Sequence, residues 1–342
     1  MTSAAARSPG LGPGQSIRLV RVTAVLACAL GTALLSWQFI RFLVIFPGPA
    51  VLAVALEVPL VVVGFVLILL LRPVRPPSLI WSGAALAWGG TAAAGCALVA
   101  NKGLIGLWAK GAGTQFAANW SASLSAPLNE EVLKLCGVIM IVLAAPRAIH
   151  GPLDGMIFGA LVGLGFQATE NVTYGLNNIV LSGATDPARA VLDSALLRVG
   201  LTALGSHWTM TAVAGAGVGY IVAHLRGGER GGVLPAVACL LVAMAMHLIF
   251  DAPQLATGIK VGVNFAIVVV LYLLLSNAYL DRAHHLLAAW AAAGKIAPDE
   301  SATLLSRRRR HRELATAATA SERSWLAARQ RALLADIERV AA

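Results

Sequence analysis

The chain has 342 residues, of which 58% are hydrophobic and only 12% are charged, and its mean hydropathy is +0.77. This composition excludes an ordinary soluble domain and predicts an all-α protein that crosses a membrane several times. The formal net charge of +10 lies largely in short loops and in the C-terminal tail, so we expect it to face anionic lipid and not nucleic acid.

Apolar runs predict about eight membrane-spanning helices between residues 18 and 280. We expect residues 1–17 to be disordered and residues 281–342 to form a basic, helical tail. The predicted spans are residues 19–46, 51–71, 79–100, 127–145, 152–176, 196–224, 233–252 and 261–279. A cleaved signal peptide is the alternative for the first span, but the apolar run is too long and no clear small-residue cleavage site follows it.

The segments between the spans complete the expected topology. Residues 102–120 are mildly amphipathic and are expected at a membrane interface, and residues 177–193 are expected to form a polar loop. Pro127 suits the first turn of the fourth span. The excess of Arg and Lys in alternate loops places both termini in the cytoplasm. The cysteines lie in apolar runs without a metal-binding spacing, so neither a disulfide framework nor a structural zinc site is expected.

Small residues recur at every fourth position in two of the spans. Gly155, Gly159 and Gly163 form such a row on the fifth span, and Gly215 and Gly219 form another on the sixth. Rows of this kind let helix backbones approach closely in a membrane. Polar side chains on the two helices could therefore meet.

Four spans also carry ionisable side chains, which are costly in hydrocarbon unless partners or function compensate. They are Glu130, Glu131 and Lys134 in the fourth span, Glu170 (before Asn171) in the fifth, His207 in the sixth, and His247 and Asp251 in the seventh. Each has a purely structural alternative: a helix-dipole effect for the fourth-span acids, a helix end for Glu170, a core histidine for His207, and a structural pair for His247 and Asp251.

These groups are expected at one depth. Glu130 lies 17 residues before Arg147, Glu170 lies 18 after Pro152, His207 lies 19 before Arg226, and His247 lies 17 after Arg230. At about 1.5 Å per residue, all four groups lie roughly 25–29 Å from the cytoplasmic ends of their helices. We therefore predict one shared site near the extracytoplasmic surface, because four unrelated structural roles would not produce a common depth.

Carboxylates and imidazoles in one pocket suit the activation of a water molecule. The sequence contains neither a GxSxG motif nor an HExxH motif, so a serine nucleophile and a zincin-type site are not supported. A divalent ion such as zinc could still be held by side chains from several helices. Its candidate ligands are Glu130, Glu170, His207 and His247.

The motifs resemble those of the PrsW family of intramembrane proteases, which is similar to the CPBP/Rce1 group of membrane endopeptidases. The resemblance covers roughly residues 20–280. It rests on Glu130-Glu131-x-x-Lys134, Phe166-x-x-x-Glu170-Asn171, the sixth-span His207 and His247-x-x-x-Asp251, in this order on successive spans. It implies that residues 18–280 form a protease domain that cleaves membrane-anchored proteins, such as anti-sigma factors.

The resemblance also implies roles for individual residues. Glu130 would be the water-activating base with Glu131 supporting it, and His247 matches the histidine that stabilises the oxyanion. Glu170 stands where the related group has a histidine, and Asp251 stands where it has Asn, so Asp251 is expected to orient His247. Such proteases have been described as metallo-type and as glutamic-type. We favour the glutamic type, with no obligatory cofactor and zinc as the alternative.

Two other functions remain open at this stage. A proton- or cation-coupled transporter could use the same Glu and His side chains as a relay, although neither an internal repeat nor a midplane site is evident. A non-catalytic scaffold would instead bind partners through the tail. The basic run at residues 307–310 is expected to contact anionic lipid or a regulator, or simply to be a solvated helix.

Overall fold

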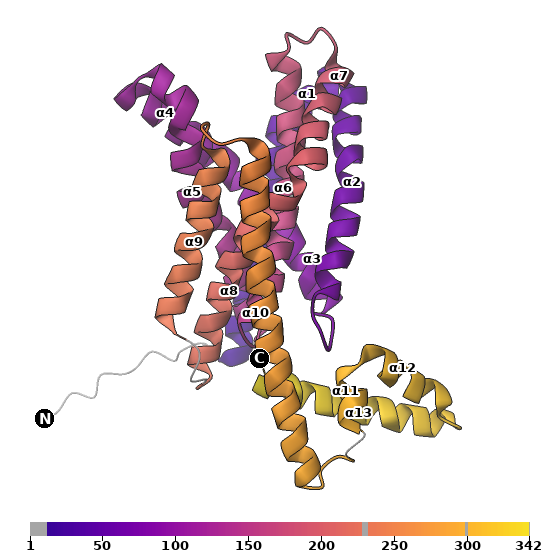
Figure 1. The fold of residues 1–342 in the computed structure, drawn as a ribbon. Coiled ribbons are helices and arrows are strands. Elements are labelled where there is room, and N and C mark those ends of the chain that lie inside the picture. Colours follow the sequence, from indigo (N-terminus) through magenta and orange to yellow (C-terminus); the bar gives the residue numbers. More distant parts are fainter. Residues whose placement is uncertain (1–11, 228–231, 298–299, 342) are drawn as a thin grey trace, which may run out of the picture.

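The computed structural model describes residues 12–227, 232–297 and 300–341, which form helices and short connections (Figure 1). The all-α prediction is therefore confirmed for the described chain. The helices are α1 (Pro13–Ile45), α2 (Pro47–Leu70), α3 (Leu79–Trp88), α4 (Ala94–Ala112), α5 (Thr114–Ala144), α6 (Pro152–Leu181), α7 (Pro187–Ala195), α8 (His207–Leu225), α9 (Val233–Asp251), α10 (Thr257–Ala292), α11 (Glu300–Leu305), α12 (Arg307–Thr316) and α13 (Ala320–Ala341). Three short irregular turns are η1 (Gly89–Ala93), η2 (Leu196–Leu201) and η3 (Ala203–Gly205).

Six helical stretches of the described chain are long and apolar enough to cross a membrane, which makes this a polytopic membrane protein. They are Pro13–Ile45, Pro47–Leu70, Leu79–Ala112, Ala203–Leu225, Val233–Asp251 and Thr257–Ala292. The predicted number was about eight, and the two remaining candidates are α5 and α6. Their composition is less apolar because protein covers much of their surface. Every α6 residue from Pro152 to Gln167 is buried, so this helix has little need of a lipid-facing side.

Several predicted boundaries are wrong. α5 begins at Thr114, so Pro127 lies inside this helix and not in its first turn. The segment expected at an interface, 102–120, instead completes α4 and begins α5. Both errors arise because residues 114–126 are polar but keep good helix propensity. A proline within a helix removes one backbone hydrogen bond and favours a local bend, here one turn before Glu130.

Other boundaries differ at the opposite side of the bundle. The loop expected at 177–193 is short, because α6 continues to Leu181 and α7 begins at Pro187. The predicted sixth span is helical only from His207, and η2 and η3 precede it. The predicted N-terminal disorder lies outside the described residues up to residue 11, and the chain is helical from Pro13.

The predicted glycine rows form the contact between α6 and α8, which is the most extensive helix pair of the structure. A Cβ atom on Gly155 would lie 2.2 Å from the carbonyl oxygen of Gly215, and one on Gly159 would lie 2.2 Å from that of Thr211. On Gly163 it would lie 2.6 Å from the carbonyl oxygen of His207. Only glycine permits this approach. The contact therefore presses the start of α8 against the middle of α6.

The C-terminal helices α11–α13 lie beside the end of the bundle that holds the start of α6 (Figure 1). Arg72, just after α2, connects them to it: its Nε donates to Asp154 at 2.6 Å and its Nη2 pairs with Glu338 of α13. The guanidinium also lies 4.2 Å from the ring centre of Tyr279. Burial alone would lower the pKa of Arg72, but the two carboxylates raise it well above its ordinary value, so the side chain stays charged.

The basic run at residues 307–310 is only partly available to lipid. Arg307 donates to the backbone carbonyl of Arg72, and Arg310 is buried and donates to the carbonyls of Leu304 and Val74. The other two arginines of the run are exposed. Half of the run therefore attaches the tail to the loop after α2.

Candidate functional site

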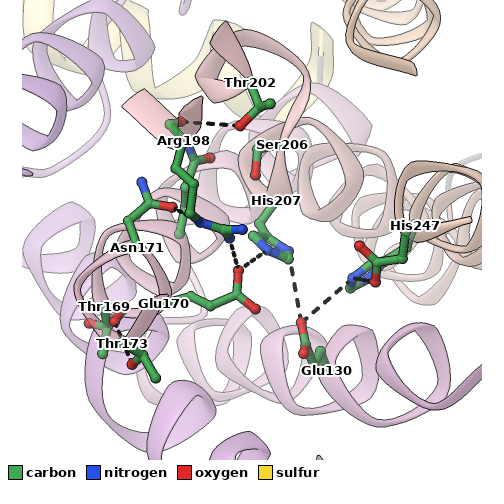
Figure 2. A network of polar contacts seen from close by, with 12 residues as sticks. Glu130, Thr169, Glu170, Asn171, Thr173, Arg198, Thr202, Ser206, His207 and His247 are labelled. Atoms are coloured by element: carbon green, nitrogen blue, oxygen red, sulfur yellow. Dashed lines mark hydrogen bonds and ion pairs between the residues drawn. The ribbon is translucent and has the colours of Figure 1, made fainter. Parts of the chain in front are cut away.

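Helices from distant parts of the sequence bring the predicted site residues together inside the bundle (Figure 2). They come from α5 (Glu130, Glu131, Lys134), α6 (Glu170), α8 (His207) and α9 (His247, Asp251). The five residues from α5 and the two histidines are at most 3% exposed, whereas the side chains of Glu170 and Asp251 are 18% and 23% exposed. The predicted convergence is therefore present in space, while the role of each residue stays a prediction.

Glu131 and Lys134 form the buried base of the site. The Nζ atom of Lys134 lies 2.6 Å from Glu131 Oε1, and the other oxygen of Glu131 accepts a hydrogen bond from Thr211 at 3.1 Å. His247 Nδ1 lies 3.0 Å from Glu131 Oε1. Because an ionised carboxylate only accepts, Nδ1 carries the proton and His247 Nε2 is directed elsewhere. Glu131 thus orients both Lys134 and His247.

Glu130 has one satisfied oxygen and one that faces open space. Oε1 accepts a hydrogen bond from Asn101 of α4 at 2.8 Å. Oε2 lies 3.6 Å from Lys134 Nζ, 3.7 Å from His247 Nε2 and 3.8 Å from His207 Nδ1. Within the described chain, Glu130 Oε2 and His247 Nε2 are buried without a hydrogen-bond partner. Such unpartnered buried atoms are unusual and indicate a place for a water molecule or an ion.

His207 is held between Glu170 and Lys134. Its Nε2 lies 2.6 Å from Glu170 Oε2, and its Nδ1 lies 3.1 Å from Lys134 Nζ. The carboxylate and the ammonium fix a neutral tautomer in which Nε2 donates and Nδ1 accepts. Phe166, one turn before Glu170, packs edge-on against the imidazole with ring centres 5.0 Å apart. The ring is therefore restrained from three sides.

Arg198 of η2 completes the environment of Glu170. Its Nη2 pairs with Glu170 Oε2, and its Nε donates to Asn171 at 2.8 Å. Asn171 in turn donates to Glu57 of α2 at 3.1 Å. The irregular turn before α8 thus serves a purpose, because it delivers a cation to Glu170 that a continuous helix would place differently.

A cavity of about 250 Å³ reaches the site between α4, α5 and α6. Glu130, Glu170 and Asp251 line it together with Asn101 and Ser125. Asp251 Oδ2 lies 3.5 Å from His247 Nε2. Polar reactants therefore have a polar path to the two unpartnered atoms, Glu130 Oε2 and His247 Nε2.

The same atoms fit a divalent metal ion. One donor atom from each of Glu130, His207 and His247 lies within 4.8 Å of the others, and one carboxylate with two imidazoles is a common zinc-binding set. Lys134 opposes this, since its ammonium lies 3.1 Å from the His207 nitrogen that would bind the ion. Glu170, the fourth predicted ligand, is not part of this group and contacts His207 Nε2 instead.

Sequence reasoning missed three partners of the site. Arg198 was assigned to an outer loop, and Asn101 was not considered because a neutral side chain carries no signal of charge in the membrane. Glu57 lies inside a predicted span, so the rule that selected Glu170 should have selected it as well. Its side chain is 6% exposed, and it supports Asn171 from the second helix.

Comparison with known proteins gives one match. The family model described as "PrsW family intramembrane metalloprotease" matches residues 76–276, a range that includes every predicted site residue. No curated protein and no solved structure matches the chain.

Proposed function

The chain belongs to the PrsW family of intramembrane metalloproteases, and from this premise we propose that Glu130 activates the water that cleaves membrane-anchored protein substrates. One observation carries the proposal: Glu130 Oε2 lies buried, without a hydrogen-bond partner in the described chain, between the side chains of His207 and His247. A carboxylate in this position can accept a proton from water.

In the proposed reaction, the water oxygen forms a bond to the carbonyl carbon of the scissile peptide and its proton passes to Glu130. The carbon–nitrogen bond then breaks, and Glu130 returns the proton to the amine nitrogen that leaves. His247, oriented by Glu131 and Asp251, is placed to bind the oxyanion when it carries a proton on Nε2. His207, held by Glu170, orients the water from the other side.

We favour direct activation by Glu130 over an obligatory metal ion, because Lys134 already places a positive charge beside Glu130 and His207. If a divalent ion binds, Glu130, His207 and His247 would hold it, and it would supply Lewis-acid activation of water and of the carbonyl group. Under either chemistry Glu131, Lys134 and Glu170 position the reacting groups, so their effects on the reaction share one geometric cause.

We further propose that α5 and α6 cross the membrane with the six apolar stretches, which gives eight spans and both termini in the cytoplasm. α6 has 30 residues and is therefore about 45 Å long, enough to cross a bilayer. The excess of Arg and Lys at the end that holds Arg72 and the tail supports this orientation. Single-span proteins, with anti-sigma factors as one example, are the proposed substrates.

The test is cleavage of a single-span reporter co-expressed with the chain. Replacing His247 by Ala removes the oxyanion partner, and we expect a loss of about 10²–10³-fold in the cleavage rate. Replacing the exposed His285 by Ala, in α10, is the matched control and should leave cleavage unchanged. Unchanged processing by both the His247→Ala and Glu130→Ala variants would show that the mechanism is wrong. Proton-coupled uptake by proteoliposomes, without cleavage, would instead favour a transporter.

A further inference from the structure

A second polar cavity lies at the other end of the bundle. It has a volume of about 950 Å³ and is enclosed by the ends of α1, α5 and α6, by the loop after α2 and by α13. Its basic lining consists of Arg21, Arg72, Arg75, Arg147 and His150. Because several helices end around it, the cavity lies at the level where a span leaves the hydrocarbon core.

Positive charge exceeds negative charge in this cavity. The only acidic side chains among its lining residues are Asp154 and Glu338, and both pair with Arg72. Four arginines therefore face two carboxylates that one arginine already engages. The remaining arginines have an electrostatic need that the described chain does not meet.

Three of these guanidinium groups retain unused donors. Arg72 Nη1 is buried and has no hydrogen-bond partner within the described residues, although the side chain as a whole is only 2% exposed. Neither Arg75 nor Arg147, both exposed, has a side-chain hydrogen bond or ion pair in the described chain. A buried charged donor without a partner is costly, so its presence beside two free arginines points to a missing acceptor.

The other lining residues fix the cavity instead of filling it. Arg21 donates twice to the backbone carbonyl of Ala144, at 3.2 and 3.0 Å, which joins α1 to the end of α5. Its guanidinium lies 5.2 Å from the ring centre of Trp81, and tryptophan is enriched at membrane interfaces. The loop that bears Arg75 is held by Arg310, whose Nη2 donates to Val74 at 2.6 Å.

We propose that this cavity binds a phosphate group, with Arg72, Arg75 and Arg147 as its donors. Guanidinium groups match the oxygen geometry of phosphate and form charge-assisted hydrogen bonds with it. Two sources share this chemistry: the headgroup of an anionic phospholipid and a soluble phosphate. Basic pockets between membrane helices at the cytoplasmic side bind such headgroups. This site is independent of the proteolytic site, from which it is separated by most of the length of α6.

The test measures binding to the full-length protein in a neutral detergent. The probes are a short-chain phosphatidylglycerol, a short-chain phosphatidylcholine with the same acyl chains, and inorganic phosphate. The pocket variant is Arg75→Gln with Arg147→Gln, since both side chains are exposed and their loss should leave the fold intact. The control variant is Arg18→Gln with Arg309→Gln, which removes the same charge from exposed positions outside the cavity.

We expect at least one anionic probe to bind saturably, about tenfold more weakly to the pocket variant and within about twofold of wild type to the control. Saturation by phosphatidylglycerol alone would identify a headgroup, and saturation by inorganic phosphate would show that the phosphate itself suffices. The proposal is overturned if neither anionic probe saturates, if both variants lose affinity equally, or if both lipids bind alike and ignore the pocket arginines. Thermal unfolding of each variant verifies that the fold is retained.

Discussion

His207 Nε2 lies 2.6 Å from Glu170 Oε2, a contact between two helices that leaves the other imidazole nitrogen directed towards Lys134 and Glu130. Glu170 is also paired with Arg198. The carboxylate therefore sets both the tautomer and the orientation of the imidazole without reaching the centre of the site itself.

Replacing Glu170 by Gln tests this positioning role. The amide keeps the shape of the side chain but loses the charge that holds Arg198 and His207. We expect the cleavage rate to fall by about 10–100-fold, as is typical for loss of a carboxylate that orients a histidine. Arg189 forms an exposed ion pair with Asp193 at 2.8 Å, so Arg189→Gln is the control and should cleave at the wild-type rate. Full activity of Glu170→Gln would contradict the positioning role.

A second prediction concerns the buried ammonium of Lys134, which is 0% exposed and lies 2.6 Å from Glu131. Lys134→Met leaves a buried carboxylate without its cation, and we expect a loss of about 3–5 kcal/mol in stability. Lys295 pairs with Asp336 at 3.6 Å near the surface, so Lys295→Met should cost less than about 1 kcal/mol.

Thermal unfolding in detergent measures both variants. Adding Glu131→Gln to Lys134→Met should recover part of the lost stability, because the double change removes the unpaired charge together with its partner. Equal and small effects of Lys134→Met and Lys295→Met would show that the buried ion pair does not stabilise the site.

A third prediction concerns the glycine contact that places His207. Gly163→Ala introduces a Cβ atom 2.6 Å from the carbonyl oxygen of His207. α8 must then move away from α6, and we expect about 1–3 kcal/mol of destabilisation with a clear loss of cleavage. Gly175→Ala, on the same helix, places its Cβ no closer than 3.8 Å to another atom and should change neither quantity. The result to look for is a difference between two identical substitutions on one helix.

The sequence predicted the membrane spans and the site better than the path of the chain between them. Glu130, Glu170, His207 and His247 could be selected because charge inside an apolar run is conspicuous. The start of α5 could not, because hydropathy marks where a helix leaves lipid and not where it begins. Arg198 was missed for a related reason: its position beside Glu170 depends on the irregular turn η2, which no local pattern signalled.

The common depth expected for the site groups is only partly reproduced. His207 begins α8 and His247 lies near the end of α9, as the spacing predicts. Glu130 instead lies near the middle of α5, since that helix begins at Thr114. The groups still meet, because α5 and α6 extend past the ends of the shorter helices α8 and α9. Convergence therefore depended on helix packing more than on equal distances from the helix ends.

A fourth prediction separates the two forms of water activation. Metal analysis of the purified protein, with cleavage measured before and after treatment with a chelator, addresses it directly. Direct activation by Glu130 predicts less than one divalent ion per chain and cleavage unaffected by the chelator. One ion per chain, with activity lost on chelation and restored by zinc, would instead assign Glu130, His207 and His247 as metal ligands.

The most direct measurement is cleavage of a single-span substrate by the purified Glu130→Gln variant in proteoliposomes. Glutamine retains the oxygen that accepts the hydrogen bond from Asn101 but cannot take a proton from water. We predict a fall in the cleavage rate of about 10²–10⁴-fold with an unchanged unfolding temperature. A folded Glu130→Gln protein that cleaves at the wild-type rate would contradict the account.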